Sequence, residues 1–342
     1  MKAMVLREVG KPLLYENMET PKPGPGEALV RVRACGVCHT DHGIWEGKVK
    51  VSLPHIMGHE GAGEVVELGP SAAGVGPEVK VGDRCAIYCY ITCGACPKCL
   101  DGRENICENF GGRIGFEVPG SYAEFVKVPA ANCIKIPDGV SFEQATLFPD
   151  ALCTPYHGLV RRGRLRAGED VVILGVGGLG IHGVQVAKAL GARVIAVDID
   201  EGKLKKAREF GASSTINAAQ EETSEAILRE TSGRGAHLIL EGVAKRETLE
   251  ASLKALRRGG RLVMMGYVAG SSFSVEQDSL LLGEHDIMGT LSICRADMLE
   301  VMELVADRRI IPQVVEEYPL EEANRALQGF DSRGPGRAIL KC

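Results

Sequence analysis

The stretch VVILGVGGLG, residues 171–180, determines how the centre of this chain folds. Residues 171–175 form an apolar run of strand length, and residues 179–190 carry apolar side chains at helical spacing. The glycines between them allow a tight turn and let a pyrophosphate approach backbone N–H groups at the start of the helix. A strand, a G-x-G-x-x-G turn and a helix in that order predict dinucleotide binding. The predicted contacts are Gly175, Gly177, Gly178, Leu179 and Gly180.

The residue that ends the next apolar run, Asp198, indicates which dinucleotide binds. It lies about 20 residues beyond the glycines, where a carboxylate accepts hydrogen bonds from the adenosine ribose hydroxyls and repels a 2′-phosphate. Asp198 therefore favours NAD over NADP. An alternative is a glycine turn kept for close helix packing, with Asp198 acting only as a helix cap.

Strands and amphipathic helices alternate along the chain after residue 150. The expected strands are 171–175, 193–198, 237–241 and 261–266, and the expected helices are 179–190, 202–210, 222–231 and 248–256. Repeated units of this kind predict a doubly wound parallel sheet covered on both faces, in a protein of the α/β class. Before residue 150, short β-rich runs such as 28–34, 63–68 and 122–128 are separated by Gly and Pro. A second, β-rich domain is therefore expected there.

Four cysteines follow the pattern C-x2-C-x2-C-x7-C: Cys93, Cys96, Cys99 and Cys107. Four thiolates on one tight loop match a closed tetrahedral zinc site, which stabilises structure and has no position open for chemistry. A bacterial-type iron–sulfur cluster also begins C-x2-C-x2-C, but its fourth cysteine follows after three residues and precedes proline. Here seven residues intervene and Glu108 follows, so structural zinc is preferred to a cluster or to free thiols.

Composition limits the other classes of function. The chain has 342 residues and 12 cysteines, with no signal-peptide pattern and no run of apolar residues long enough to span a membrane. Reduced thiols in a cytoplasmic protein of two domains are the expectation. A formal charge of -5, without a block of Lys or Arg, argues against a nucleic-acid surface.

Two further clusters, Cys38-His39-Thr40-Asp41 and Gly58-His59-Glu60, suggest a second metal site. A catalytic zinc needs a few protein ligands and one open position, and a thiolate with an imidazole supplies two of them. Spacing alone leaves the third ligand undetermined.

These motifs together resemble the zinc-dependent alcohol dehydrogenases of the medium-chain dehydrogenase/reductase family. The resemblance spans residues 1–342. Besides the cysteine lobe and the glycine turn, it rests on three motifs: C-G-V-C-H-T-D at 35–41, G-H-E-G-A-G at 58–63 and G-R-A-I-L at 336–340. It implies a GroES-like catalytic domain, residues 1–151 and 294–342, and a Rossmann domain, residues 152–293. It also implies two zinc ions per chain, NAD, a small alcohol, aldehyde or ketone substrate, and a homodimer or homotetramer.

The resemblance assigns roles residue by residue. Cys38 and His59 become ligands of the catalytic zinc, with Glu60 as an occasional ligand. The third ligand, often a cysteine, is Asp150 here, and Cys153 three residues later is a less favoured substitute. Asp41 orients the zinc-bound imidazole.

The remaining carried-over roles concern proton transfer and the cofactor. Thr40 relays a proton toward the cofactor ribose, but Gly43 stands where the family often has the last histidine of the relay, and the neighbouring His42 leaves the terminal acceptor open. The expected cofactor contacts are His39, Thr154, Lys203 and Arg337. The expected lining of the substrate cleft is Trp45, Tyr90 and Phe110.

Three alternatives remain open. A zinc-free quinone reductase would lack the metal ligands and the cysteine lobe, and a protein that binds NAD without catalysis would have lost ligands. Within enzymes, a polyol or sugar dehydrogenase is the second choice, because Glu60 and a third ligand other than cysteine also occur in that class.

Overall fold

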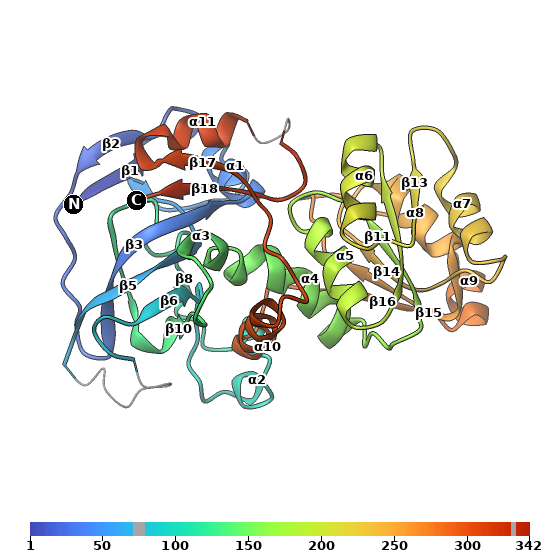
Figure 1. The fold of residues 1–342 in the computed structure, drawn as a ribbon, viewed down its shortest axis with the longest axis horizontal. Helices are drawn as coiled ribbons and strands as arrows, with labels where there is room; N and C mark the ends of the chain where they lie inside the picture. Colours follow the sequence, from blue (N-terminus) through green and yellow to red (C-terminus); the bar gives the residue numbers. More distant parts are fainter. Residues whose placement is uncertain (71–78, 330–332) are drawn as a thin grey trace.

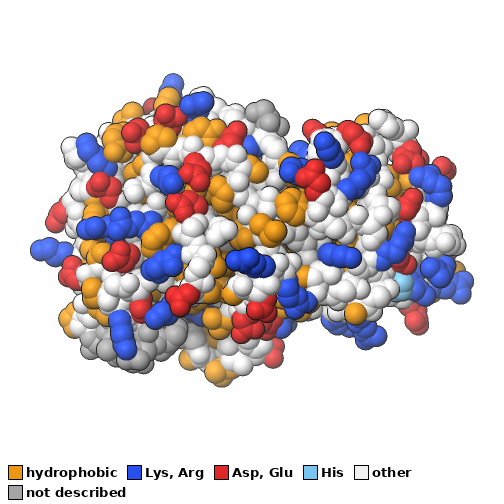
Figure 2. Space-filling model, in the orientation of Figure 1, with side chains coloured by type: hydrophobic (Ala, Val, Ile, Leu, Met, Phe, Trp, Pro, Cys, Tyr) orange, Lys and Arg blue, Asp and Glu red, His pale blue; other side chains and the backbone are white. Residues whose placement is uncertain are grey.

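The computed structural model describes residues 1–70, 79–329 and 333–342. Two units lie side by side, a β-rich unit that contains both chain termini and a unit built on a parallel sheet (Figure 1). Figure 2 shows a notch in the surface where the two units meet, and lysine, arginine and acidic side chains are mixed over the visible face. Within the described ranges, no helix combines the length and the apolar character required to cross a membrane.

The β-rich unit is organised around one large mixed sheet. Its strands run in the order β10-β6-β5-β3-β18-β17, with β9 also paired to β3. These strands are β3 (Glu27–Val37), β5 (Glu60–Leu68), β6 (Arg84–Ile87), β9 (Phe125–Pro129), β10 (Cys133–Lys135), β17 (Val314–Pro319) and β18 (Arg337–Lys341). Smaller sheets contain β1 (Lys2–Leu6), β2 (Leu14–Asn17) and β4 (His55–Ile56), and β7 (Tyr90–Ile91) with β8 (Gly112–Arg113).

The last strand of the chain completes the sheet that the first third of the chain begins. β18 pairs antiparallel with β3, so that Ala338 lies opposite Val37 and Leu340 lies opposite Cys35. Residues 337–340 are buried, which fixes the C-terminal segment in the core of the β-rich unit. The segment that contains Arg337 is therefore held against the strand that leads to Cys38.

The second unit contains a six-stranded parallel sheet in the order β13-β12-β11-β14-β15-β16. Its strands are β11 (Asp170–Leu174), β12 (Arg193–Asp198), β13 (Ser214–Asn217), β14 (Ala236–Glu241), β15 (Leu256–Met264) and β16 (Asp286–Gly289). The first strand, β11, lies in the middle of the sheet. The next two strands are added on one side of it and the last three on the other side, as in a Rossmann fold. The predicted doubly wound sheet is confirmed.

Helices cover both faces of this sheet. α5 (Gly180–Ala189) contacts α6 (Glu201–Glu209), while α7 (Thr223–Glu230) contacts α8 (Arg246–Lys254). All four predicted strands and all four predicted helices of this unit are present, with ends shifted by a few residues. The short strands β13 and β16 and the helix α9 (Gln277–Gly283) were not expected, because these segments carry polar residues or too few apolar ones for a periodic signal.

One continuous helical stretch, residues 148–162, joins the two units (Figure 1). It consists of η3 (Phe148–Leu152), α4 (Cys153–Tyr156) and η4 (His157–Arg162), where η3 and η4 have π-helical geometry. Such wide turns often occur at functional sites because they redirect a side chain. The expected boundary between the GroES-like and the Rossmann domain, at residues 151 and 152, falls inside this stretch. Because the helical stretch is continuous there, it does not mark a boundary, and the domain limits stay a prediction.

The other helical segments are short, except for one that packs against the connecting stretch. That helix, α10 (Arg295–Ala306), contacts both α4 and η3. The remaining segments are α1 (His39–Trp45), α2 (Pro97–Leu100), α3 (Phe142–Ala145), α11 (Ala323–Gln328), η1 (Glu104–Ile106), η2 (Ala130–Asn132) and η5 (Leu320–Glu322).

Candidate active site

Four predicted ligands come together at the junction of the two units. One ligand atom from each of Cys38, His59, Glu60 and Asp150 lies within 4.8 Å of the other three. Cys38 Sγ is 3.4 Å from Asp150 Oδ2. Cys38, His59 and Glu60 are buried, and the Asp150 side chain is 15% exposed. The sequence therefore brings one thiol, one imidazole and two carboxyl groups to a single point from three separate segments.

Cys38 is placed by the start of a short helix. It is the N-cap of α1, with extended backbone angles, and its Sγ accepts a hydrogen bond from the Thr40 amide. In return, the Asp41 carboxylate accepts from the Cys38 amide at 2.9 Å. This reciprocal capping fixes the thiol at the positive end of a helix, where a thiolate is favoured.

His59 and Glu60 stand at the beginning of β5, beside β3. Gly36 lies opposite Glu60 in the register of the two strands, and a Cβ at Gly36 would lie 1.8 Å from Glu60 Oε2. Only glycine leaves the room that Glu60 occupies. The glycine in C-G-V-C-H-T-D therefore belongs to the site, although it carries no functional group.

Asp41 lies behind the histidine, as expected of a group that orients a ligand. His59 Nδ1 is 3.3 Å from Asp41 Oδ1, and the Tyr122 hydroxyl donates to Asp41 Oδ2 at 3.1 Å. Burial lowers the pKa of His59, but Asp41 and Cys38 outweigh it and raise that pKa well above its usual value. With Nδ1 directed to Asp41, Nε2 is left to bind a metal ion.

Arg337 connects the two carboxyl groups. Its Nε donates to Glu60 Oε2 at 3.0 Å, and its Nη2 donates to both Glu60 Oε1 and Asp150 Oδ2. Burial raises the pKa of Glu60 to about 8, although Arg337 opposes that rise. For Asp150 the opposite balance holds: burial is outweighed by Arg337 and His59, and the pKa falls to about 2. Asp150 is therefore the anionic carboxylate of the pair.

Asp150 lies in the wide helical turn η3, and its neighbours hold it in place. The Thr154 hydroxyl donates to Asp150 Oδ1 at 2.6 Å. Cys153, the alternative third ligand, is fully buried and directs its Sγ toward the carbonyl oxygen of Asp297 instead. Among the described residues that could hold an ion, Asp150 belongs to this group and Cys153 does not.

The donor set fits a zinc ion. Sulfur, imidazole nitrogen and carboxylate oxygen are the ligands that zinc uses in proteins, and a thiolate with one carboxylate balances a divalent charge. The buried Nδ1 of His59 and Oδ1 of Asp41 have no well-aligned hydrogen-bond partner. A cation on the other ring nitrogen would strengthen the contact between them.

The four cysteines of the lobe also converge. Cys93 Sγ lies 3.5 Å from Cys107 Sγ and 3.9 Å from Cys99 Sγ, and Cys96 Sγ lies 3.9 Å from Cys107 Sγ. Four sulfurs about 2.3 Å from one zinc ion are about 3.8 Å apart at tetrahedral angles. Backbone amides of Ala95 and Cys96 lower the pKa of Cys93 to about 6. The spacing matches a single ion, whereas a cluster would need space for several metal atoms.

The glycine turn joins β11 to α5 at the carboxyl edge of the parallel sheet. Gly175 has a φ of +90°, and a Cβ at Gly180 would lie 1.9 Å from the Gly175 carbonyl oxygen. A Cβ at Gly177 would meet nothing within 4 Å, whereas one at Gly178 would lie 3.0 Å from an Arg337 nitrogen. Open space above Gly177, next to a guanidinium, suits a pyrophosphate.

Asp198 ends β12 beside this turn. Its Oδ2 accepts from the Val176 amide at 2.7 Å, and its Oδ1 accepts from the amides of Ile199 and Asp200. The carboxylate is therefore fixed in orientation and ties the glycine turn to β12. Asp200, rather than Asp198, caps α6, so the reading of Asp198 as a plain helix cap is wrong.

The residues expected to transfer the proton or to contact the cofactor lie at different distances from the four metal-ligand candidates. Thr40 Oγ1 is 3.5 Å from Cys38 Sγ. His42 Nδ1 is 3.3 Å from a Glu46 oxygen, and the rings of His39 and His42 stack with their centroids 6.0 Å apart. Lys203 lies in the first turn of α6, where its backbone amide donates to Asp200. Thr40 is thus next to the metal ligands, whereas the His42 ring interacts with α1 itself.

The three expected cleft residues do not form one cluster. Trp45 donates its indole N–H to the Lys11 carbonyl at 2.7 Å, which gives it a structural contact. Tyr90 is buried and packs against Phe110, which is 41% exposed, with ring centroids 5.7 Å apart. The lining of the substrate cleft therefore stays a prediction.

Sequence reasoning missed residues that hold the two units together. His182 Nδ1 bonds to the Gly178 carbonyl, and its Nε2 accepts from the Gln313 amide at 3.0 Å. Gln185 makes two hydrogen bonds to the backbone of Ile311. Both side chains face inward from α5. Two polar residues on the apolar face of a predicted helix could have indicated buried hydrogen bonds to another segment.

Comparison with protein families agrees with this geometry. Residues 24–138 match the model of the alcohol dehydrogenase GroES-like domain, and residues 178–307 match that of the zinc-binding dehydrogenases.

Individual proteins are similar over the whole length. An alcohol dehydrogenase of Geobacillus stearothermophilus is 37% identical, and an NAD-dependent alcohol dehydrogenase of Sulfolobus acidocaldarius is 36% identical; each comparison covers 100% of this chain and 99% of the relative. The solved alcohol dehydrogenase of Thermus sp. ATN1 has a TM-score of 0.92 at 32% identity, with coverage of 100% and 99%. The chain belongs to the zinc-dependent alcohol dehydrogenases of the medium-chain dehydrogenase/reductase family.

Proposed function

We propose that this protein interconverts alcohols and the corresponding aldehydes or ketones, with NAD as hydride carrier and zinc at Cys38, His59 and Asp150. The observation that carries the proposal is the position of Arg337. Its guanidinium bonds to Glu60 and Asp150 and also lies beside Gly178 in the cofactor turn. One residue therefore joins the metal site to the place where a dinucleotide binds.

Each group has a role in the proposed reaction. A bound zinc ion supplies positive charge that eases proton loss from an alcohol oxygen, and NAD accepts the hydride. Thr40, beside Cys38, accepts the proton of the substrate hydroxyl through its oxygen and passes its own proton outward. Thr154 and Arg337 orient Asp150, while Asp41 holds the His59 ring with Nε2 directed to the metal site. Glu60 serves as the alternating ligand.

Cofactor contacts follow from the glycine turn. The amides of residues 177–180 and the Arg337 guanidinium bind the pyrophosphate, and Asp198 accepts the ribose hydroxyls. His39 and Lys203 add contacts at the pyrophosphate and at the adenosine ribose. The relatives named above are alcohol dehydrogenases, so the polyol or sugar reading gains no support from them.

A substrate panel tests the activity. Primary, secondary, aromatic and polyol substrates are offered with NAD, and NADH formation is followed by absorbance. We expect turnover of at least one simple alcohol and about two zinc ions per chain. Brief chelation should abolish turnover and remove one ion first, because Asp150 is a harder ligand than a thiolate. Full activity with a single zinc, or iron accompanied by acid-labile sulfide, would contradict the assignment.

The protein is also proposed to be a cytoplasmic homo-oligomer. Reduced thiols suit the four-cysteine site, and the described residues contain no disulfide. β16 is an edge strand, and near it Leu281 and Leu282 of α9 are 68% and 66% exposed. A second copy related by a twofold axis would pair with this edge and cover these side chains.

A further inference from the structure

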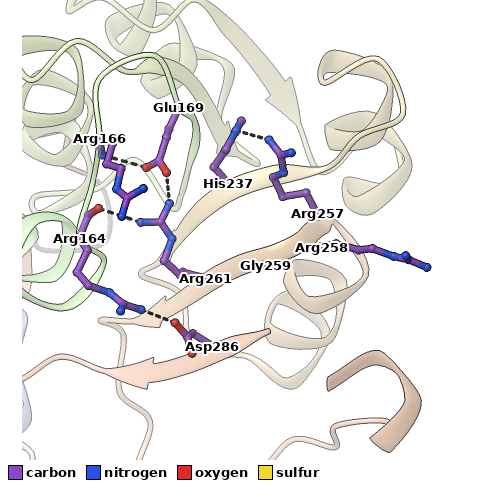
Figure 3. A pocket seen from close by; sticks show the side chains of 9 residues that line it. All are labelled: Arg164, Arg166, Glu169, His237, Arg257, Arg258, Gly259, Arg261 and Asp286. Carbon is purple, nitrogen blue, oxygen red and sulfur yellow. Dashed lines mark hydrogen bonds and ion pairs between the residues drawn. The ribbon is translucent and has the colours of Figure 1, made fainter. Parts of the chain in front are cut away.

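An open pocket lined mainly by arginines lies at the amino edge of the parallel sheet (Figure 3). Its volume is about 420 Å³, and the residues that line it come from the loop before β11, from the starts of β14 and β16 and from the first half of β15. The cofactor turn leaves the opposite, carboxyl edge of the same sheet. The lining residues are Arg164, Arg166, Glu169, His237, Arg257, Arg258, Gly259, Arg261 and Asp286.

The positive charge of this pocket exceeds its negative charge. Five arginines face two carboxylates, and the two carboxylates are already paired. Arg164 forms an ion pair with Asp286, and the buried Arg261 forms one with Glu169. Arg166, Arg257 and Arg258 make no ion pair with a carboxylate among the residues that the structure describes. The surplus is notable because the whole chain carries a formal charge of -5.

The side chains of Arg166 and Arg257 lie next to other residues of the pocket, whereas that of Arg258 does not. Figure 3 shows Arg166 next to Arg261 on one side of the pocket and Arg257 next to His237 on the other, while Arg258 points away. Arg257 is half-buried, so its charge is only partly screened by water. Two unpaired guanidinium groups at opposite sides of one hollow would attract a single anion.

His237 supplies a second, independent observation. Its Nδ1 accepts a hydrogen bond from the Asp170 amide at 3.0 Å, and its Nε2 contacts Arg257. A neutral imidazole carries its hydrogen on one nitrogen, so both nitrogens cannot accept. With Nδ1 as acceptor, the N–H at Nε2 faces the N–H of Arg257. An anionic oxygen in the hollow, within hydrogen-bond distance of both donors, would accept from both.

The state of His237 is consistent with this excess of charge. Burial lowers its pKa, and the positive charges of Arg257 and Arg261 lower it further, although Asp170 and Glu169 oppose the effect. Burial is the largest of these causes, and the charge of Arg257 adds to it.

We propose that this pocket binds a pyrophosphate group, either as the free anion or as part of a nucleotide, at a site separate from the cofactor site. Arginine forks match phosphate oxygens with two parallel hydrogen bonds, and the two phosphates of one pyrophosphate carry enough charge to meet two guanidinium groups. The phosphates contact Arg166 and Arg257, and one oxygen accepts from the free N–H groups of Arg257 and His237 on the side of the hollow. Arg261, held by Glu169 and the carbonyls of Gly163 and Arg164, forms the floor.

Calorimetric titration of the zinc-loaded enzyme tests the proposal. NADH is present throughout at one equivalent per chain, so that it fills the cofactor site without an excess that would compete for the pocket, and sodium pyrophosphate is the first probe. We expect one pyrophosphate per chain. In Arg166→Gln/Arg257→Gln the affinity should fall at least tenfold. Neither substitution removes an ion pair, and equal melting temperatures of the variant and the parent would verify that the fold is intact.

A matched control removes the same charge elsewhere. Arg103→Gln/Arg308→Gln changes two exposed arginines outside the pocket and should leave the affinity unchanged. Zinc content is measured before and after titration, because pyrophosphate chelates divalent ions. Absence of binding to the parent enzyme, or equal weakening in the two double variants, would overturn the proposal.

A second probe identifies the source of the phosphate. ADP is titrated under the same conditions as pyrophosphate. Tighter binding of ADP, with the same dependence on Arg166 and Arg257, would indicate a nucleotide, whereas weaker binding would indicate the free anion.

Discussion

Single residues determine whether the metal site can form, and Asp150 is the most informative of them. It is the anionic carboxylate that meets Cys38, and Thr154 and Arg337 fix its orientation. Cys153, only three residues away, lies on another face of the same helical stretch. The wide turn η3 decides which of the two side chains faces the metal site.

Replacing Asp150 tests the third ligand. Asp150→Ala should lose one zinc ion and reduce kcat/KM by at least a hundredfold, because the anionic carboxylate is lost and Glu60, whose pKa is raised to about 8, is a poorer substitute beside Cys38 and His59. Asp150→Cys, which restores a ligand that zinc accepts, should retain the metal and part of the turnover. Metal analysis and steady-state kinetics give the answer. Cys153→Ala is the control and should keep both zinc ions; loss of zinc in that variant alone would move the ligand to Cys153.

We expect the preference between NAD and NADP to depend on Asp198. In the parent enzyme, kcat/KM should be higher with NAD than with NADP, because the carboxylate repels a 2′-phosphate. Asp198→Gly should reduce this preference at least tenfold, measured as the ratio of the two kcat/KM values. The variant also loses three backbone contacts of the carboxylate, so its unfolding temperature should fall. Equal use of both cofactors by the parent enzyme would disprove the assignment.

At the scale of elements, α5 has two functions. Its first turn presents the glycine amides, and its buried face holds residues 311–313 of the segment that leads back to the β-rich unit. His182 is central to this contact, because it bonds to Gly178 on one side and to Gln313 on the other. Burial lowers its pKa to about 4, so the ring is neutral in the folded protein at neutral pH.

The stability of this contact should depend on pH. An unfolded histidine titrates near 6.5. Because the folded pKa lies below the unfolded one, the unfolded chain binds the proton first as the pH falls. The contribution of His182 is therefore complete above about pH 6.5 and decreases as the pH falls toward 4, by at most about 3 kcal/mol.

Comparison with His182→Gln isolates this effect, since Gln keeps a donor and an acceptor but does not titrate. The difference in unfolding free energy between parent and variant, measured in urea, should shrink between pH 6.5 and pH 4. A difference that is constant over this range would show that His182 is not the titrating group.

At the scale of the whole molecule, the edge of the parallel sheet leads to a prediction about assembly. Among the strands that the structure describes, β16 has a partner on one side only, and α9 exposes Leu280, Leu281 and Leu282. Large exposed leucines next to an open edge are typical of an interface between subunits.

Charge placed at this edge should prevent assembly. Leu281→Glu/Leu282→Glu should shift the protein to a smaller species in sedimentation velocity, because two carboxylates from each copy would be buried against each other. Leu100→Glu, at the 76% exposed leucine of the cysteine lobe, is the control and should leave the size unchanged. A parent protein that sediments as a monomer would contradict the proposal.

The sequence by itself determined the doubly wound sheet, the glycine turn, the four-cysteine site and the family. These features are local: strand and helix periodicity, glycines at fixed spacing and cysteines on one short loop depend on neighbouring residues only. The residues of the proposed catalytic zinc site were named from the sequence as well, but through the family resemblance.

Only the tertiary structure decided how distant segments meet. Cys38, Asp150 and Arg337 are far apart along the chain, and their contacts depend on β18 pairing with β3 and on the wide turn η3. Gly36 and Tyr122 acquire their roles from Glu60 and Asp41, which no local pattern places beside them. The arginine pocket likewise exists because the parallel sheet brings the amino ends of separate strands to one edge, and sequence periodicity carries no information on that meeting point.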